Sequence, residues 1–99
     1  MAAPLLFLLL LALAVPAAHA DPATERYAPA QLRVAHDFLE HARAAADLGE
    51  IERAGKLAWA ASLDARLAWG MTESEQLRAE AAEVGREAGA LVHRLAARR

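Results

Sequence analysis

Apolar residues recur at steps of three and four along most of the chain, which is the spacing that places them on one face of an α-helix. The first such face, between residues 30 and 48, comprises Leu32, Ala35, Leu39, Ala42 and Ala46. The second begins near residue 50 and comprises Ile51, Ala54, Ala58, Ala61, Ala65 and Ala68. The third comprises Leu77, Ala81, Val84, Ala88, Leu91 and Leu95. Because no β-branched run alternates with polar residues, the sequence predicts an all-α protein.

Proline and glycine positions indicate where these helices begin and end. Pro22 and Pro29 both disfavour helix in the residue before them, so residues 21–28 are predicted to form an extended leader. Pro29 then suits the first turn of the first helix. Gly49 is a natural left-handed terminator for that helix. Because the next apolar face follows at once, residues 29–99 are predicted to form an antiparallel helical hairpin.

Residues 70–75 allow two interpretations. Thr72 and Glu75 have the spacing of a capping box, which would begin a third helix. Against this, a single glycine inside a helix costs only about 1 kcal/mol relative to alanine, and no proline follows Gly70. We therefore expect one long second helix, bent at Gly70 and about 73 Å long if straight. The alternative is a three-helix bundle with a break near Gly70.

The long second helix would leave an apolar row exposed, because its end would extend past the first helix. Such a row needs a partner to be stable in water, so we expect it to bind a second copy of the chain as a homodimer, with a coiled-coil-like heptad spacing. Two tryptophans on the same helix are further candidates for an interaction surface, because exposed tryptophan often anchors interfaces. The alternative is that they cap a shallow core. The candidate interaction residues are Trp59, Trp69, Leu77, Val84, Leu91 and Leu95.

Residues 1–20 are predicted to be a signal peptide. Residues 5–15 form an uncharged apolar run, which is shorter than the ~20 residues of a membrane-spanning helix but typical of a secretory signal. Ala18 and Ala20 provide the small side chains that signal peptidase accepts, so cleavage is expected before Asp21. We therefore expect a periplasmic protein without a stable membrane span after processing. A retained membrane anchor is the alternative.

The composition excludes several classes of function. The 99 residues include no cysteine, which excludes disulfides and thiolate metal sites, and the net charge of −2 gives no electrostatic argument for binding nucleic acid. His36 and Glu40 share a helix face, but His41 points about 140° away, whereas a transition-metal site needs three or four converging ligands. We therefore predict a solvated polar face there, with no metal, cofactor or catalytic residue.

Two pairs of acidic residues are also candidates for a catalytic site. Arginines lie near both pairs on a helix that is expected to be exposed. The two pairs are Glu73 with Glu80 and Glu83 with Glu87, and the arginines are Arg78 and Arg86. We interpret both pairs as solvated charge, and not as paired acids of an enzyme.

The segment Tyr27-Ala28-Pro29-Ala30-Gln31-Leu32, the alanine spacing that follows it, Gly49-Glu50 and Asp64-Ala65 together form a pattern. It resembles the bacterial domain of unknown function 4398 (DUF4398) from about residue 27 to residue 83. That family implies an exported helical hairpin of the Gram-negative envelope, often on a lipoprotein or beside an OmpA-like domain. The resemblance supplies no catalytic residues, and this chain has no cysteine for lipid attachment.

Together these observations predict a non-enzymatic helical interaction module of the periplasm or cell envelope. We expect it to bind an envelope protein or itself. The alternative is peripheral membrane or lipid binding through an amphipathic helix, which the apolar row Leu91-Val92-Leu95 and the C-terminal arginines would favour. The acidic stretch of residues 73–87 argues against anionic lipid.

Overall fold

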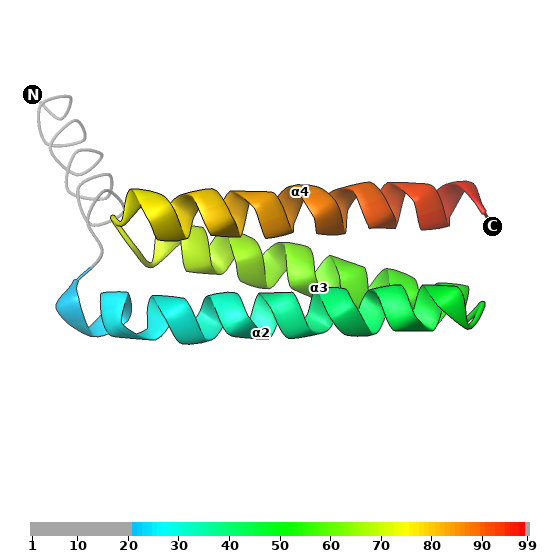
Figure 1. Ribbon diagram of the computed structural model, residues 1–99, viewed down its shortest axis with the longest axis horizontal. Coiled ribbons are helices and arrows are strands. Elements are labelled where there is room, and N and C mark those ends of the chain that lie inside the picture. Colours follow the sequence, from blue (N-terminus) through cyan, green and yellow to red (C-terminus); the bar gives the residue numbers. More distant parts are fainter. Residues whose placement is uncertain (1–20, 99) are drawn as a thin grey trace, which may run out of the picture.

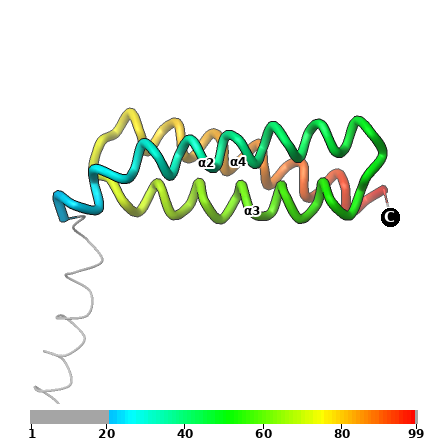
Figure 2. Tube along the Cα trace, turned by 90° about the horizontal axis from the view of Figure 1, so that it is seen from below, coloured from blue at the N-terminus to red at the C-terminus, as the bar shows by residue number. Residues whose placement is uncertain are grey.

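A computed structural model describes residues 21–98, which form three α-helices. These are α2 (Pro22–Asp47), α3 (Ile51–Gly70) and α4 (Glu75–Ala97), and each runs antiparallel to the one before it (Figure 1). Figure 2 shows that α3 lies to one side of both α2 and α4, so the three axes form a triangle. The predicted all-α class is confirmed. The predicted signal peptide, residues 1–20, lies outside the described residues.

The core is built largely from alanine. Helix α2 contributes Leu32, Leu39 and several alanines, and the buried residues of α3 are all alanines: Ala54, Ala58, Ala61, Ala65 and Ala68. Side chains this small let helix backbones approach closely, so that many weak dispersion contacts replace a few large side chains. The faces predicted for the first two helices are confirmed, with Ile51 and Ala46 packing at the edge of the core.

The turn between α2 and α3 forms as its sequence predicts. Gly49 has a φ of 79°, the left-handed conformation that glycine adopts without strain. The Glu50 N–H donates to the Ala45 carbonyl at 2.9 Å and the Gly49 N–H to the Ala46 carbonyl at 3.0 Å. This pair of hydrogen bonds is a Schellman motif, which satisfies the last carbonyls of α2.

The extended leader predicted for residues 21–28 is wrong, because α2 begins at Pro22. Asp21 caps the helix by accepting a hydrogen bond from the Thr24 N–H at 2.8 Å, and the helix continues through Pro29. An interior proline costs a helix about 3 kcal/mol. Contacts with the rest of the bundle offset this cost, since Ala28 is buried and Glu25 reaches the distant α3–α4 turn.

The prediction of one long second helix is also wrong, and the three-helix alternative is the observed arrangement. Helix α3 ends at Gly70 and α4 begins at Glu75, so the chain reverses between them. The predicted Thr72–Glu75 capping box does not form the cap. Ser74 is the N-cap instead, accepting a hydrogen bond from the Leu77 N–H at 3.3 Å.

Burial of α4 explains why the chain reverses. Fully burying a valine or leucine side chain contributes about 1.5–3 kcal/mol, and α4 buries Val84, Leu91 and Leu95. Interrupting the helix forgoes a few backbone hydrogen bonds, each with a net value of about 0.5–1.5 kcal/mol. The apolar row of α4 therefore finds its partner within the chain, which removes the reason for which we expected a second copy.

Candidate interaction surface

The solvent side of α3 contains larger apolar side chains than its buried side. Trp59, Leu63, Leu67 and Trp69 are 56%, 44%, 53% and 46% exposed, respectively. The first three follow one another at steps of four residues, which keeps them on one side of the helix. We call these four residues the α3 outer face. Trp69 comes two residues after Leu67, so it lies about 160° away around the helix, on the side toward α4. Large apolar side chains left in water often mark interaction sites on soluble proteins.

Two hollows lie along the seam between α3 and α4, and we call them together the α3–α4 groove. One, of about 300 Å³, is lined by Ser62, Ala65, Arg66, Trp69, Ala81, Ala82, Gly85 and Arg86. The other, of about 280 Å³, is lined by Gly55, Lys56, Trp59, Val92, Leu95 and Ala96. Each tryptophan therefore borders one hollow. The ten residues between them correspond to about 15 Å along the helix.

Small residues form much of the α4 side of the groove. A Cβ atom at Gly85 would lie 3.8 Å from the Cβ of Ala65, which is ordinary contact. The hollow beside Gly85 therefore exists because both helices carry small side chains where they meet, leaving room for a side chain from outside.

The charged residues that line the groove are all basic. They are Lys56, Arg66 and Arg86, and neither hollow is lined by a carboxylate. Arg86 pairs with Glu83 on its own helix, and this hydrogen bond lowers the pKa of Glu83. Within residues 21–98, Lys56 and Arg66 form no ion pair. The groove thus combines an apolar floor with two unpaired cations.

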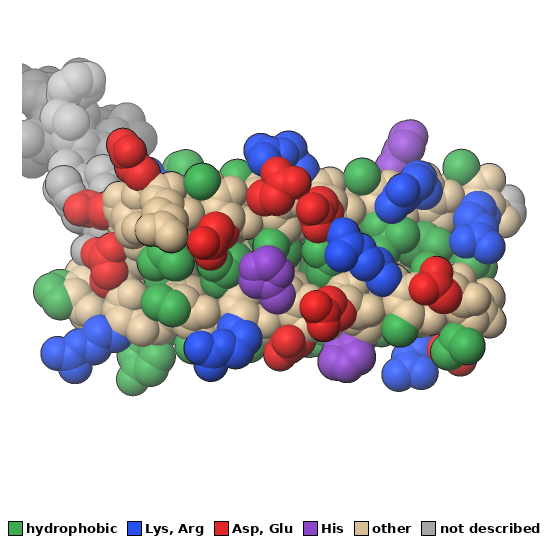
Figure 3. Space-filling view, in the orientation of Figure 1, with side chains coloured by type: hydrophobic (Ala, Val, Ile, Leu, Met, Phe, Trp, Pro, Cys, Tyr) green, Lys and Arg blue, Asp and Glu red, His purple; other side chains and the backbone are tan. Residues whose placement is uncertain are grey.

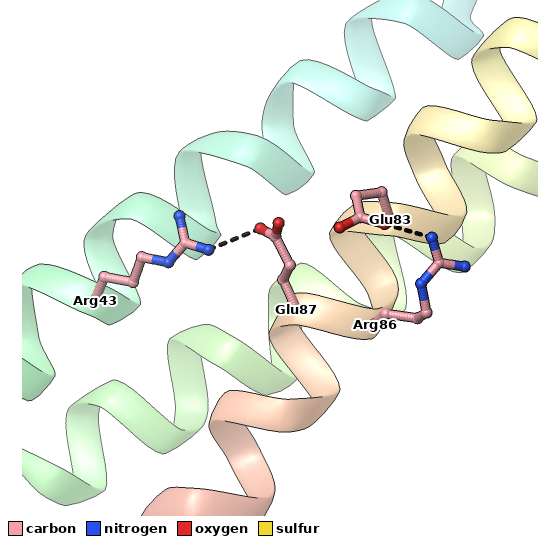
Figure 4. A network of polar contacts seen from close by, with 4 residues as sticks. All are labelled: Arg43, Glu83, Arg86 and Glu87. Atoms are coloured by element: carbon pink, nitrogen blue, oxygen red, sulfur yellow. Dashed lines mark hydrogen bonds and ion pairs between the residues drawn. The ribbon is translucent and has the colours of Figure 1, made fainter.

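The opposite face of the bundle differs, because its charges are mixed. Figure 3 shows acidic and basic side chains interspersed along the face formed by α2 and α4. Arg43 of α2 reaches Glu87 of α4 at 2.7 Å, next to the Arg86–Glu83 pair (Figure 4). A hollow of about 460 Å³ on this side is lined by charges of both signs: Arg43, Asp47, Arg94 and Arg98.

The α3–α4 turn is fixed by a side chain from the first turn of α2. Thr72 is fully buried, and its hydroxyl donates to Glu25 Oε1 at 2.8 Å. The same oxygen accepts the Glu73 N–H at 2.9 Å. Hydrogen bonds from the Glu73 N–H and the Thr72 hydroxyl lower the pKa of Glu25 below its ordinary value. The carboxylate of Glu25 therefore ties α2 to the turn.

Arg78 connects this turn to the groove. Its Nε donates to the Thr72 carbonyl at 2.7 Å, and its guanidinium carbon lies 4.1 Å from the centroid of the Trp69 ring. A cation over an indole face contributes about 0.5–1 kcal/mol at an exposed site. This contact favours one orientation of the Trp69 ring before any partner binds.

The structure divides the six residues predicted for an interaction surface into two groups. Trp59 and Trp69 are exposed and border the groove. The other four belong to the core: Val84, Leu91 and Leu95 are 2%, 7% and 2% exposed, and Leu77 packs against them. The prediction of an exposed row was wrong because α4 folds back onto the other helices.

The sequence pattern did not predict the α4 side of the groove. It also did not identify Lys56 as a residue of the groove or Leu67 as a residue of the α3 outer face. One signal was present in the sequence. Gly55, Trp59, Ser62, Arg66 and Trp69 follow a heptad-like spacing along one side of α3, next to its row of buried alanines. The matching positions on α4 could not be identified without knowing that the chain reverses after residue 71.

The residues considered for metal binding or acid chemistry do not converge. His36, Glu40 and His41 are all exposed, and residues 21–98 contain no group of three or more side chains suited to hold a metal ion. Glu83 and Glu87 pair with different arginines. The described helices also include none that is long and apolar enough to cross a bilayer.

Comparison with known proteins agrees with the pattern in the sequence. The family model of a domain of unknown function, DUF4398, matches residues 12–84. Among the described residues, this match covers α2, α3 and the first part of α4. No curated protein and no solved structure matches the chain significantly.

Proposed function

We propose that this chain, which belongs to the DUF4398 family of domains of unknown function, is a non-enzymatic interaction module that docks a partner protein through α3. The observation that carries the proposal is the α3 outer face, where two tryptophans and two leucines are about half-exposed. Tryptophan is among the residues that contribute most to binding when an interface covers them.

These side chains are free to bind because the fold scarcely uses them. The buried residues of α3 are alanines, so the outer face is not required to hold α2 and α4 together. Apolar surface removed from water contributes roughly 25 cal/mol per Å². A partner that covered the four side chains would therefore gain free energy that the monomer leaves unused.

The proposed location is the periplasm. The apolar run of residues 5–15 and the small residues before Asp21 support export. Fractionation of cells and an intact mass for the exported protein test this part of the proposal. A mass that begins at Asp21 is expected, and a cytoplasmic protein that retains Met1 would contradict it.

Lipid binding and self-association are less well supported. Both were inferred from the apolar row near the C-terminus, and Leu91 and Leu95 are buried in the core. The docking of another protein through α3 needs no such row.

Site-specific crosslinking in living cells tests the docking proposal. A photoreactive amino acid placed at Leu63, on the α3 outer face, should give an adduct of one defined mass with another protein. The control position is Glu40, which is exposed on α2 and should give no such adduct. Equal labelling from both positions, or none from Leu63, would contradict the proposal.

A further inference from the structure

We infer that the α3–α4 groove binds an acidic amphipathic α-helix of a partner protein, an inference that rests on the docking function proposed above. It adds the shape and the charge of the partner. Three features of the groove lead to it: two hollows in line, a seam of small residues, and cations without carboxylates.

The shape of the groove fits a helix. The hollows lie on the same seam between two antiparallel helices, and their tryptophans are about 15 Å apart along α3. A fourth helix lying along this seam would place apolar side chains ten or eleven residues apart into the two hollows. Small residues at the contact, such as Gly85 and Ala82, permit the interaxial distance of about 8–10 Å at which helices pack.

The charge of the groove selects an acidic partner. Lys56 and Arg66 lack an ion pair within the described chain, and Arg78 lies over the Trp69 ring. Glutamates flanking the apolar side of an incoming helix would reach these cations at the rim. Complementary charge of this kind favours the correct partner and speeds its association.

A second copy of this chain does not suit the same surface. A two-fold dimer through the groove would place Lys56, Arg66 and Arg86 of one copy against the same residues of the other. Like charges facing each other across an interface oppose association. The partner is therefore expected to be a different protein that carries an acidic helix.

A peptide-binding experiment on the intact protein tests the inference. The probe is a synthetic amphipathic helix with leucines at the anchor positions and glutamates on its polar side, and the matched probe carries lysines instead. The intrinsic fluorescence of Trp59 and Trp69 should change when the acidic peptide binds. The lysine peptide should bind at least about tenfold more weakly, and salt should weaken the acidic complex.

Charge-reversal variants locate the binding. The double variant Lys56→Glu, Arg66→Glu should weaken the affinity for the acidic peptide by about tenfold or more. The matched control is Arg26→Glu, Arg33→Glu, which makes the same change in net charge on exposed positions of α2 and should alter affinity by less than about twofold. Equal effects of the two variants would overturn the inference.

A steric variant tests the hollow directly. Gly85→Leu places a side chain into the hollow beside Trp69, and its Cβ makes only ordinary contact, at 3.8 Å from the Cβ of Ala65. Circular dichroism should show the wild-type helix content while peptide binding is lost. Ala90→Leu is the control, because Ala90 is exposed and lines neither hollow. Retained binding by folded Gly85→Leu protein would contradict the inference.

The outcomes separate this inference from the docking function. If the Leu63 position crosslinks to a protein but the intact chain binds both peptides equally or neither, docking stands and the acidic helix is the wrong partner. Binding to phosphatidylglycerol vesicles without binding to the acidic peptide would assign the cations to a membrane surface, and would overturn the inference as well.

Discussion

The two sides of α3 carry side chains of opposite size. Its buried side consists of five alanines, none more than 2% exposed, whereas its outer face carries two tryptophans and two leucines that are 44–56% exposed. A surface helix usually turns its large apolar residues toward the core. The inversion indicates that stability and surface chemistry are supplied by different residues of the same helix, so each can be changed separately.

The buried side depends on close approach from both neighbours. Alanine provides little apolar area of its own, so its contribution comes from the contacts that the adjoining helices make around it. Helix α3 packs against α2 on one side and α4 on the other, and both supply the larger core residues such as Leu39 and Val84. Removing either neighbour would expose the part of the alanine row that it covers.

Truncation after Met71 should have the largest effect. It removes α4, with the buried side chains of Val84, Leu91 and Leu95. The two alanine-lined helices that remain depend on tertiary packing for their stability, and they lose the apolar face that α4 covered. We expect the truncated protein to lose its cooperative thermal transition, as followed by circular dichroism. A truncated protein that melts cooperatively near the wild-type temperature would show that α4 is dispensable to the core.

Overpacking the buried side should have the next largest effect. Ala58→Leu or Ala61→Leu inserts a larger side chain where the residue is fully buried, and should lower the free energy of unfolding by roughly 1–3 kcal/mol. Glu80→Leu, at an exposed position of α4, is the control and should cost little. Urea titrations would rank the variants, and the reverse order would show that the facing rows are assigned wrongly.

The pH dependence of stability tests the contact that closes this core at the α3–α4 turn. Because the pKa of Glu25 is lower in the folded than in the unfolded chain, its contribution is fully present above the unfolded value of about 4.3. The contribution is lost as the pH falls through the lower, folded value. Stability should therefore decline with acidification below about pH 4.

Glu25→Gln removes this titration. The variant should be less stable than the wild type at pH 7, and its melting temperature should change less between about pH 5 and pH 3. Glu40→Gln, which removes an exposed carboxylate of the same helix, should keep the wild-type profile. If Glu25→Gln and the wild type decline in parallel, the turn is not held by the charged carboxylate.

Substitution on the outer face should have the smallest effect on folding. Leu67→Gln replaces a side chain that is 53% exposed, and should change the free energy of unfolding by no more than about 0.5 kcal/mol. Measured beside Ala61→Leu, it gives the sharpest contrast between the two sides of α3. A loss as large as that of Ala61→Leu would show that the outer face belongs to the core.

The two turns of the chain show which features could be predicted from the sequence. The α2–α3 turn depends on residues within six positions of one another, since the Schellman motif joins Ala45 and Ala46 to Gly49 and Glu50. Its glycine therefore predicted it correctly. The α3–α4 turn depends on Glu25, which is 47 residues from Thr72, and no local pattern reveals such a contact.

The sequence by itself determined the helical class, the faces of the helices, the Gly49 turn and the exposed tryptophans as candidates, because each rests on spacing along a single helix or on the conformation of one residue. Only the tertiary structure decided that α2 begins before Pro29, that the chain reverses after Met71 and that α4 forms one wall of a groove. One continuous helix and two antiparallel helices joined by a turn differ little in local helix propensity over the last fifty residues. The balance is set by burial of the α4 row against α2 and α3, an energy that exists only when the three helices are together.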